Sequence, residues 1–370
     1  MKTYHVLGLM SGSSLDGLDI AFCEFEFNQQ QLQSWRILHA ETMPLSEEWQ
    51  QKLKILPQVS GKELMLAHTE FGHYVGDLVN QFLKQYPQAP DFIASHGHTI
   101  FHFPNEKMTL QIGDGAAIAA ITGYPVISDL RSMDVALGGQ GAPVAPIADH
   151  YLLNGYDFYL NLGGISNVTC HVNDKYIAFD IGGANQILNA LAQKLDLPFD
   201  IGGVIAASGT LNVELLTQAN ALPYYQQPYP KSLGNDWVQE QLIPIFLNFD
   251  AKTSDKLHTA CLHIAFQVAK SIGQIIEHEY FKKEQYRLLA TGGGALNQFL
   301  MDCIRNACSK VADIEIIVPE PELIGFKEAA LIALMGVLRV ENLPNCIASV
   351  TGASRDAVGG AIHQGWRKQV

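Results

Sequence analysis

The strongest constraint on the fold of this chain is a strand–turn–strand pattern that occurs twice. The segments "HVLGLMSGSSLDGLDIAF" and "FYLNLGGISNVTCHV" each contain an apolar strand, a glycine-bearing turn with hydroxyl or amide side chains, and a second strand. Glycine permits positive φ and close approach, so the N–H groups of such a turn can converge on an anion. The repetition indicates two copies of one hairpin-led unit, each with a candidate phosphate-binding turn.

The first turn also offers groups suited to a phosphate that arrives with Mg2+. Ser11, Ser13 and Ser14 add hydroxyl donors. Asp16 and Asp19 would repel a bare phosphate, but Mg2+ prefers carboxylates and retained waters. Turn chemistry alone would explain an isolated loop of Ser, Asp and Gly. Because the pattern is repeated, we instead predict a cradle for a metal–nucleotide complex.

A third glycine element, "RLLATGGGALNQFLMDCI", is typical of an apolar strand followed by a turn and a helix. Gly292, Gly293 and Gly294 would let a nucleotide lie against the backbone at the strand-to-helix junction. A dinucleotide-binding fold fits poorly, because the first strand-to-helix turn lacks G-x-G-x-x-G and the first glycine loop returns to a strand. The sequence also lacks G-x-x-x-x-G-K-[ST], which excludes a P-loop enzyme.

Strand and helix patterns alternate along the chain and predict an α/β protein. Strands are expected within residues 4–10, 19–25, 91–103, 124–130, 157–172 and 175–183, and long amphipathic helices within 61–86 and 255–281. Glycines and prolines in "GGQGAPVAPIADHYLLNG" indicate a boundary between two groups of elements.

Composition limits the classes of partner. The 370 residues are 48% hydrophobic and 16% charged, enough apolar content for two domains with cores. A net charge of -13 without a run of Lys or Arg excludes a nucleic-acid or anionic-membrane surface and favours small-molecule partners. No apolar run approaches the roughly 20 residues of a membrane-spanning helix, and none forms a signal peptide, so a cytoplasmic protein is expected. Six cysteines without a Cys-x-x-Cys pair predict buried thiols.

A series of motifs resembles, in order and spacing, those of the anhydro-N-acetylmuramic acid kinases. The series covers nearly the whole chain, and its most specific members are "MSGSSLDGLD" and "DVALGGQGAPVAP". The others are "SHGHT", "TLQIGDGAAIAAITGYPVISDLRSM", "LNLGGISNVT", "FDIGGAN", "ASGT", "TGGGALN", "FKEAALIAL" and "SVTGAS".

The resemblance implies a two-domain actin-like ATPase fold, a duplicated ribonuclease H-like architecture with a central nucleotide cleft. The expected domains are residues 1–140, completed by 345–370, and residues 141–344, which carry the adenosine-binding glycine loop. The implied enzyme uses ATP to open the 1,6-anhydro bond of 1,6-anhydro-N-acetylmuramic acid and to phosphorylate O6, giving N-acetylmuramic acid 6-phosphate in cell-wall recycling. Whether the chain forms a homodimer is left open.

The resemblance also implies site residues. The implied catalytic residue is Asp180, and the implied metal ligands are Asp16 and Asp19, which hold Mg2+ with ATP directly or through water. The implied sugar contacts are His96, Arg131 and Glu328. The residues implied to bind the nucleotide are Gly12, Ser13, Ser14, Leu15, Asp16, Gly17, Leu18, Asp19, Gly163, Gly164, Asn167, Gly292, Gly293, Gly294 and Asn297.

Asp180 ends the apolar strand "YIAF", where a carboxylate could activate water at the anomeric carbon. The alternative is an N-cap for the helix in "NQILNALAQKL", a common use of Asp before a helix. Two departures from many relatives lie nearby. The turn reads "DIGGAN" instead of Asp-Thr-Gly-Pro-Gly-Asn, which could move the helix start, and residues 234–236 read Gly-Asn-Asp instead of Gly-Arg-Glu.

The implied sugar contacts have structural alternatives. Arg131 suits the lactyl carboxylate, because its guanidinium binds carboxylates through two hydrogen bonds, but it could instead pair with Asp129 or Asp134. Glu328 could accept hydrogen bonds from sugar hydroxyls or begin an exposed helix, where an acidic residue suits the dipole. Gln111 and Asp114 lie in a family motif without an assigned side-chain role.

Three histidines in "SHGHTIFHF" raise the question of a zinc site. Strand alternation would place His96, His98 and His102 on one face, and imidazole is the usual zinc ligand. No other cluster supplies a further ligand, so histidines on a strand near the substrate are favoured, with His96 beside the sugar.

Three other functions remain as competitors. A kinase of the same fold that acts on another sugar is the main alternative, because its nucleotide cradle would look alike. A chaperone-like or filament-forming ATPase would need a further binding domain or polymerising surface, and a silent sugar-binding regulator would lack the base at Asp180.

Overall fold

The computed structural model describes residues 1–12, 15, 17–142, 147–148, 151–173 and 175–366. The chain forms two compact units, Met1–Asn154 with Phe326–Val370 (unit 1) and Gly155–Gly325 (unit 2). The boundaries expected from the sequence were 140/141 and 344/345. The units change at 154/155 and at 325/326. The second boundary lies at 325/326 because residues 326–340 belong to a helix that packs on the sheet of unit 1.

Unit 1 contains a seven-stranded sheet with the order β12-β6-β4-β1-β2-β3, in which β5 also pairs with β4. Its strands are β1 (Lys2–Ser11), β2 (Gly17–Asn28), β3 (Gln31–Pro44), β4 (Phe92–Phe103), β5 (Met108–Ile112), β6 (Val126–Ser128) and β12 (Ala361–His363). Its helices are α1 (Glu47–Ile55), α2 (Gly61–Gln85), α3 (Gly115–Thr122), α4 (Ser132–Ala136), the greater part of α13 (Pro321–Val340), and α14 (Ala348–Thr351).

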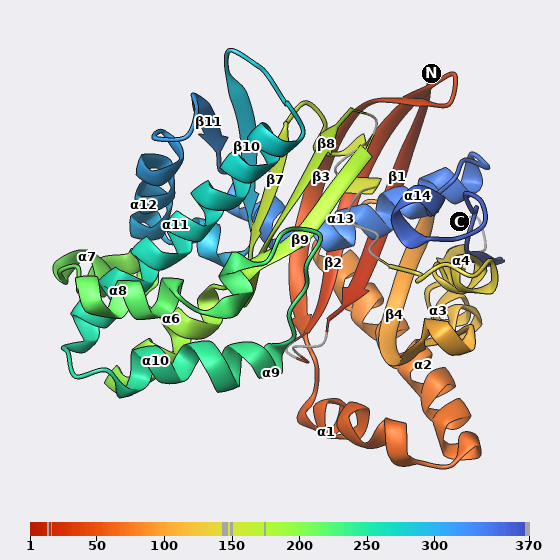
Figure 1. Cartoon of the computed structure of the whole chain (residues 1–370). Coiled ribbons are helices and arrows are strands. Elements are labelled where there is room, and N and C mark those ends of the chain that lie inside the picture. Colours follow the sequence, from red (N-terminus) through yellow and green to blue (C-terminus); the bar gives the residue numbers. More distant parts are fainter. Residues whose placement is uncertain (13–14, 16, 143–146, 149–150, 174, 367–370) are drawn as a thin grey trace. The chain divides into compact units, whose positions relative to one another are not determined.

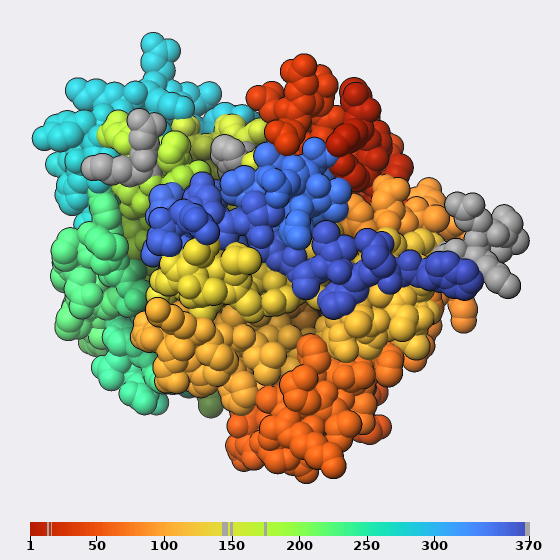
Figure 2. Space-filling model, turned by 90° about the vertical axis from the view of Figure 1, so that its right-hand side faces the viewer, coloured from red at the N-terminus to blue at the C-terminus, as the bar shows by residue number. Residues whose placement is uncertain are grey.

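Helices cover both faces of this sheet. Leu7 and Leu9 of β1 point to a core that includes Phe71 and Phe82 of α2, and α2 packs against α3 and β5 (Figure 1). Gly8 faces the other way, where a Cβ would lie only 1.9 Å from the carbonyl oxygen of Ala329 in α13. The strand and the helix therefore pack backbone against backbone. In Figure 2 the dark blue C-terminal segment lies against gold and yellow segments, in agreement with the pairing of β12 with β6.

Unit 2 contains a five-stranded sheet with the order β11-β10-β7-β8-β9. Its strands are β7 (Phe158–Leu162), β8 (Ile165–Val172), β9 (Lys175–Gly183), β10 (Tyr286–Thr291) and β11 (Ile314–Ile317). Its helices are α6 (Asn185–Ala192), α7 (Val204–Ser208), α8 (Val213–Asn220), α9 (Asn235–Trp237), α10 (Ile243–Asn248), α11 (Thr253–His278) and α12 (Gln298–Cys308). Leu160, Val168 and Phe179 of the sheet share one core with apolar residues of α6, α8, α11 and α12.

The two sheets have the same strand order. In unit 1, β3, β2 and β1 are antiparallel neighbours, and β4 and β6 then follow parallel to β1. In unit 2, β9, β8 and β7 are antiparallel neighbours, and β10 and β11 follow parallel to β7. Each unit begins with the hairpin that the repeated sequence pattern indicates. This confirms the predicted α/β fold with a duplicated ribonuclease H-like architecture.

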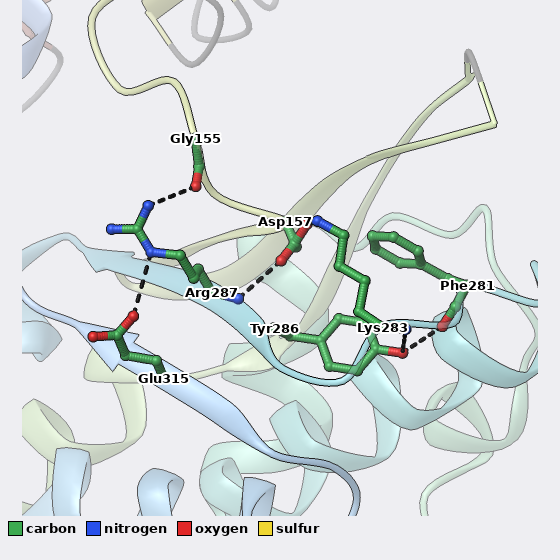
Figure 3. Close-up of polar contacts among 7 residues, drawn as sticks. All are labelled: Gly155, Asp157, Phe281, Lys283, Tyr286, Arg287 and Glu315. Atoms are coloured by element: carbon green, nitrogen blue, oxygen red, sulfur yellow. Dashed lines mark hydrogen bonds and ion pairs between the residues drawn. The ribbon is translucent and has the colours of Figure 1, made fainter.

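A polar network holds the start of β7 against β10 (Figure 3). The buried Asp157 carboxylate accepts hydrogen bonds from Lys283 Nζ at 2.5 Å and from the Arg287 main-chain N–H at 2.9 Å. The Arg287 guanidinium donates to the Gly155 carbonyl at 2.9 Å and to Glu315 at 3.3 Å. The Asp157 carboxylate thereby joins the segment at the start of unit 2 to Lys283 and to β10.

All six cysteines are buried free thiols, as the sequence predicts, and burial raises the pKa of Cys170 to about 12. None of the helices in the described ranges is both long and apolar enough to cross a membrane.

Candidate functional site

Asp180 lies within β9, three residues before the strand ends at Gly183. It pairs with Asn167 of β8, and Asn167 pairs with Asn161 of β7. Directly paired residues on adjacent strands project from the same face of a sheet. Their neighbours Leu160 and Val168 belong to the core, so the row Asn161–Asn167–Asp180 lies on the opposite face. This row places two amides beside the predicted catalytic carboxylate.

The surroundings of Asp180 fix one of its carboxylate oxygens. The Leu233 N–H donates to Oδ2 at 3.0 Å, and within the described part of the chain no donor reaches Oδ1. Partial burial raises the pKa of Asp180 above its usual value, whereas the Leu233 hydrogen bond acts in the opposite direction. The carboxyl group is therefore half-desolvated, with one oxygen available to accept a proton.

The N-cap alternative for Asp180 is wrong. Helix α6 begins at Asn185, its N-cap is Ala184, and no side chain caps it. The Ala184 N–H donates to the Gly164 carbonyl at 2.8 Å, and the Asn185 N–H donates to the Gly163 carbonyl at 3.0 Å. The β7–β8 turn thus supplies the acceptors that a side-chain cap would otherwise provide.

The three glycines after β10 lie against the end of β7. Gly292 has a φ of 82°, and a Cβ on it would meet the Leu162 carbonyl group at 2.8 Å. A Cβ on Gly294 would also meet Leu162 at 2.8 Å, whereas the exposed Gly293 has no atom closer than 3.7 Å. Close packing therefore requires Gly292 and Gly294, while Gly293 leaves open backbone that a ligand can approach.

Asn297, which we expected to bind the nucleotide, is the N-cap of α12. Its Oδ1 accepts a hydrogen bond from the Leu300 N–H at 3.0 Å. A Cβ on Gly203 would lie 2.2 Å from the same oxygen. The side chain thus already has a structural role in positioning the helix that follows the triple glycine.

The β1–β2 turn is described only in part. Ser13, Ser14 and Asp16 lie outside the described residues. Gly12, Leu15, Gly17 and Leu18 are described, and Leu15 has a φ of 61°. The Leu15 N–H approaches the Gly12 carbonyl at 3.5 Å.

Asp19 lies three residues into β2, opposite Thr42 of β3. The Thr42 hydroxyl donates to Asp19 Oδ1 at 2.6 Å. Of the two predicted metal ligands, Asp19 is thus the one whose carboxylate orientation the structure shows. Among the described residues no group of three or more His, Cys, Asp or Glu side chains could hold a metal ion.

Unit 1 contains a cavity of about 270 Å³ beside Ser95 and His96 of β4, residues of β5 and the end of β6. Its lining is mostly polar and brings together residues that are distant in sequence. The titratable and amide side chains that line it are His68, His96, Gln111, Asp114, Asp129 and His363. Asp114 also caps α3 by accepting from the Ala116 N–H at 2.9 Å. His96 is thus the sequence-predicted sugar contact that lines a cavity.

His96 is 7% exposed, and burial lowers its pKa to about 4. Its Nδ1 lies 3.0 Å from the Gly97 carbonyl, which can only accept, so Nδ1 carries the proton and donates. Nε2 of the neutral ring is then an acceptor in the cavity wall. The nearby Arg131 guanidinium also lowers the pKa of His96, which shows that the two side chains are electrostatic neighbours.

Arg131 precedes α4 and is partly buried, and this burial lowers its pKa. Its Nε donates to the Gly141 carbonyl at 2.6 Å. In the described part of the chain it forms no ion pair with Asp129 or Asp134, so that alternative is wrong. Asp134 instead accepts from the Gly141 N–H and the Thr351 hydroxyl, both at 2.7 Å. Among the described residues, the other guanidinium nitrogens form no hydrogen bond, so they could contact a ligand.

Glu328 is exposed on α13, two turns after the helix begins at Pro321. The alternative in which it starts a helix is therefore wrong. Across the described residues no hydrogen bond or ion pair joins it to His96 or Arg131, so its contact with the sugar stays a prediction.

The three strand histidines have different partners. His98 Nδ1 lies 3.0 Å from the Ser11 hydroxyl, and its ring meets the edge of Phe71 in the core. His102 Nδ1 lies 3.1 Å from the Thr109 hydroxyl. Of the three, His96 is the one whose side chain lines the cavity.

Several residues of these sites were missed by the sequence reasoning. In unit 2 they are Asn161, Tyr224 and Leu233, and in unit 1 they are His68 and His363. Asn161 could have been found, because it precedes the Gly-Gly turn in "LNLGG". The others come from distant segments and carry no local signal.

The shared strand order of the two sheets defines a protein of the duplicated ribonuclease H-like class. Residues 4–365 match the family model for anhydro-N-acetylmuramic acid kinase. The relative of that name from Haemophilus influenzae is 33% identical over 393 residues, which cover 98% of each chain. The one from Coxiella burnetii is 32% identical and covers 99% of each chain. The chain belongs to the anhydro-N-acetylmuramic acid kinase family, and it is a kinase.

More distant structures share only a general likeness. The activator of 2-hydroxyisocaproyl-CoA dehydratase from Clostridium difficile, solved with bound ADPNP, is 13% identical, with a TM-score of 0.42. It covers 91% of this chain and 97% of its own. This likeness is too weak to carry an argument about ligands.

Proposed function

We propose that the protein uses ATP to convert 1,6-anhydro-N-acetylmuramic acid into N-acetylmuramic acid 6-phosphate. The observation that carries the proposal is the family match over residues 4–365, together with a half-buried carboxylate at Asp180 that has a free oxygen. Because N-acetylmuramic acid is a cell-wall sugar, the proposed reaction would serve cell-wall recycling.

In the proposed reaction Asp180 accepts a proton from water while the water oxygen forms a bond to the anomeric carbon. The bond between that carbon and O6 breaks, and its electron pair stays on O6. O6 then bonds to the γ-phosphorus of ATP, and the bond to the bridging oxygen breaks with its electron pair leaving on ADP. Asp180 finally releases its proton to solvent. Sugar, water and ATP thus give the sugar phosphate, ADP and a proton.

The residues proposed to bind the nucleotide lie in glycine elements, which are described for each unit by itself. The open backbone at Gly293 and the β7–β8 turn at Gly163 and Gly164 support a nucleotide site in unit 2. In unit 1 the β1–β2 turn from Gly12 to Asp19 would contact the phosphates. Asp19 suits a Mg2+ ligand, because Thr42 already orients its carboxylate, and bound Mg2+ would neutralise charge on the phosphates. Asn167 is proposed to contact the nucleotide from the row that contains Asp180.

The sugar would use the cavity of unit 1. A neutral His96 accepts a hydrogen bond from a sugar hydroxyl or from the acetamido N–H. Arg131 has guanidinium nitrogens available for the lactyl carboxylate. Glu328, which is exposed, is proposed to accept hydrogen bonds from sugar hydroxyls. A cytoplasmic location and a homodimer stay predictions of the sequence.

The test is to incubate the protein with Mg-ATP and 1,6-anhydro-N-acetylmuramic acid and to measure the product mass. The product should gain both one water and one phosphate group, because O6 is free for phosphorylation only after the anhydro bond opens. Asp180→Asn is the matched control and should give almost none of this product. An inert anhydro sugar alongside rapid phosphorylation of another amino sugar would favour the alternative kinase.

A further inference from the structure

Three residues of one segment hold Asp180 at three different atoms. The Tyr224 hydroxyl donates to the Asp180 carbonyl at 2.6 Å, and the Asp180 N–H donates to the Lys231 carbonyl at 3.1 Å. The Leu233 N–H donates to the Oδ2 atom of the carboxylate at 3.0 Å. The main chain and the side chain of Asp180 are therefore both fixed by residues outside the sheet.

These residues are themselves fixed. Tyr224 is 5% exposed, and Lys231 Nζ donates to its carbonyl at 3.2 Å. The Lys231 ammonium also lies 4.5 Å from the centre of the Tyr224 ring, a cation–π distance. The next residue, Tyr225, packs so closely on Gly182 that a Cβ there would meet its hydroxyl at 2.7 Å. The segment is anchored on both sides of the carboxylate that it contacts.

The contacts leave a specific part of Asp180 available. Oδ2 is held by a main-chain donor, whereas Oδ1 receives no hydrogen bond from any described residue. A carboxylate that can rotate must lose that freedom before it can take a proton in a defined direction. Holding one oxygen while leaving the other free removes that rotation in advance.

We propose that Tyr224, Lys231 and Leu233 are positioning residues that hold the Asp180 carboxylate with Oδ1 ready to accept the proton of the attacking water. The inference rests on the proposed function, in which Asp180 is the base. It adds residues 44 to 53 positions away from Asp180 in the chain, for which no local sequence motif gave a signal.

The Leu233 hydrogen bond also affects ionisation. A donor to the charged carboxylate favours the charged form and lowers the pKa, against the effect of partial burial. The titratable side chain that faces Asp180 from the contacting segment is the Tyr224 phenol. The Lys231 ammonium bonds to the Tyr224 carbonyl instead, and Asn167 of β8 is neutral. Because burial raises the pKa of Tyr224, its phenol does not change charge as the pH is lowered from 7.

The first test compares Leu233→Pro with Leu233→Ala. Proline removes both the N–H donor and the leucine side chain, whereas alanine keeps the N–H and removes only the leucine side chain. The Asp180 pKa, read from carboxyl ¹³C chemical shifts and from the acid limb of kcat against pH, should rise by about one unit in Leu233→Pro only. Equal pKa values in the two variants would overturn the proposal.

A second comparison keeps the test decisive if Leu233→Pro does not fold. Tyr224→Phe removes only the hydroxyl that bonds to the Asp180 carbonyl, and Tyr229→Phe is its control because that hydroxyl bonds to Glu279 instead. Tyr224→Phe should lower kcat about tenfold with KM for ATP unchanged, and it should shift the Asp180 ¹³C signal. The same kinetics and the same Asp180 signal in both variants would contradict the proposal.

The carboxyl signal separates this inference from the proposed function. It is measured without substrates, so it reports on Asp180 even in a protein that shows no kinase activity. If the parent protein shows no kinase activity but the Asp180 pKa still rises in Leu233→Pro, the positioning contact is supported and the proposed reaction is contradicted. If the parent protein is active but the Asp180 pKa is unchanged in Leu233→Pro, the proposed reaction is supported and the positioning contact is contradicted.

Discussion

The two sheets carry their carboxylates on different strands of the same architecture. In unit 1, the third residue of β2 is Asp19 and its partner on β3 is Thr42. In unit 2, the third residue of β8 is Asn167 and its partner on β9 is Asp180. The acidic residue thus lies on the second strand of one hairpin-led unit and on the third strand of the other.

The difference changes what each carboxylate can do. Asp19 accepts a hydrogen bond from a hydroxyl in the same row, at 2.6 Å, which suits a group that must keep its charge and orientation. Asp180 is half-buried, and one of its oxygens receives no hydrogen bond from the described residues. Partial burial raises its pKa, as a proton acceptor requires. Under the proposed function, one duplicated scaffold would thereby provide one anchoring and one reactive carboxylate.

The largest expected effect comes from Asp180→Asn. Loss of a general base should lower kcat by ~10²–10⁴, while the melting temperature stays near that of the parent, because Asp180 caps no helix. The measurement is kcat with saturating substrates together with a melting curve. Asp302→Asn, on the exposed face of α12, is the control. A kcat near the parent value in Asp180→Asn would contradict the reactive role that separates Asp180 from Asp19.

The second prediction concerns a buried histidine in each unit. His96 of unit 1 has a pKa of about 4 and faces the cavity, whereas both ring nitrogens of His263 in unit 2 have partners. As the pH falls below 6.5, the unfolded chain protonates at His96 before the native protein does, so stability falls down to about pH 4. Over that window the loss is about 3 kcal/mol, since each pKa unit corresponds to about 1.4 kcal/mol.

His96→Gln should remove this part of the pH dependence and leave the part from His263. Urea unfolding at pH 7 and pH 4.5 would measure it, with parent and variant compared at each pH. The variant should lose less stability on acidification than the parent does. Equal losses would mean that His96 is not held neutral by its surroundings.

The third prediction compares the aspartates that precede the parallel strands. Asp157 is buried and bonds to Lys283 and to the Arg287 N–H (Figure 3). Asp91 of unit 1 accepts from the His5 N–H at 2.8 Å but is exposed. Asp157→Asn should lower the free energy of unfolding of unit 2 by about 2 kcal/mol, because a charged hydrogen-bond acceptor is lost from a buried position.

Asp91→Asn should have a clearly smaller effect on unit 1. Hydrogen exchange of the amides of β10 and of β4 would report on the two units separately, with faster exchange expected in β10 of Asp157→Asn. Equal acceleration in both variants would show that burial does not separate the two aspartates.

The smallest expected effect comes from Thr42→Val, which keeps the branched shape and removes the hydroxyl that orients Asp19. KM for Mg-ATP should rise about fivefold, as the loss of one hydrogen bond of about 1 kcal/mol implies, and kcat should change less than twofold. Thr169→Val, on β8, is the matched control. A hundredfold loss of kcat in Thr42→Val would contradict the assignment of the reactive carboxylate to unit 2.

The sequence predicted the elements with a clear local pattern. The two hairpins, α2, α11 and the strand before the triple glycine all alternate or repeat in the expected periods. Strand β3 was missed because its residues are exposed or partly exposed along most of its length, so its polar sequence has no strand alternation. Strand β12, which has only three residues, was also missed, whereas the equally short β6 lies within the strand expected at residues 124–130. Such short strands depend on their neighbours more than on their own composition.

The candidate site was predictable only where a residue lies in a motif. Asp180 lies near the end of a strand and the triple glycine follows one, so both could be found on the chain itself. Asn297 lies in the same kind of motif, yet its side chain caps α12. Tyr224 and Leu233 reach Asp180 from 44 and 53 residues away, and His363 reaches the cavity from near the C-terminus. Contacts of this range depend on tertiary packing, for which one sequence holds no periodic signal.

The contacts at Asp180 have a consequence for self-association. β9 is the last strand of its sheet, and an open strand edge can pair with a strand from another molecule. At Asp180 the main-chain N–H and carbonyl that such pairing would use are already bonded to Lys231 and Tyr224. A strand from a second molecule would have to displace both contacts before it could extend the sheet at this point. The segment that contacts Asp180 therefore also hinders strand addition at this position of β9.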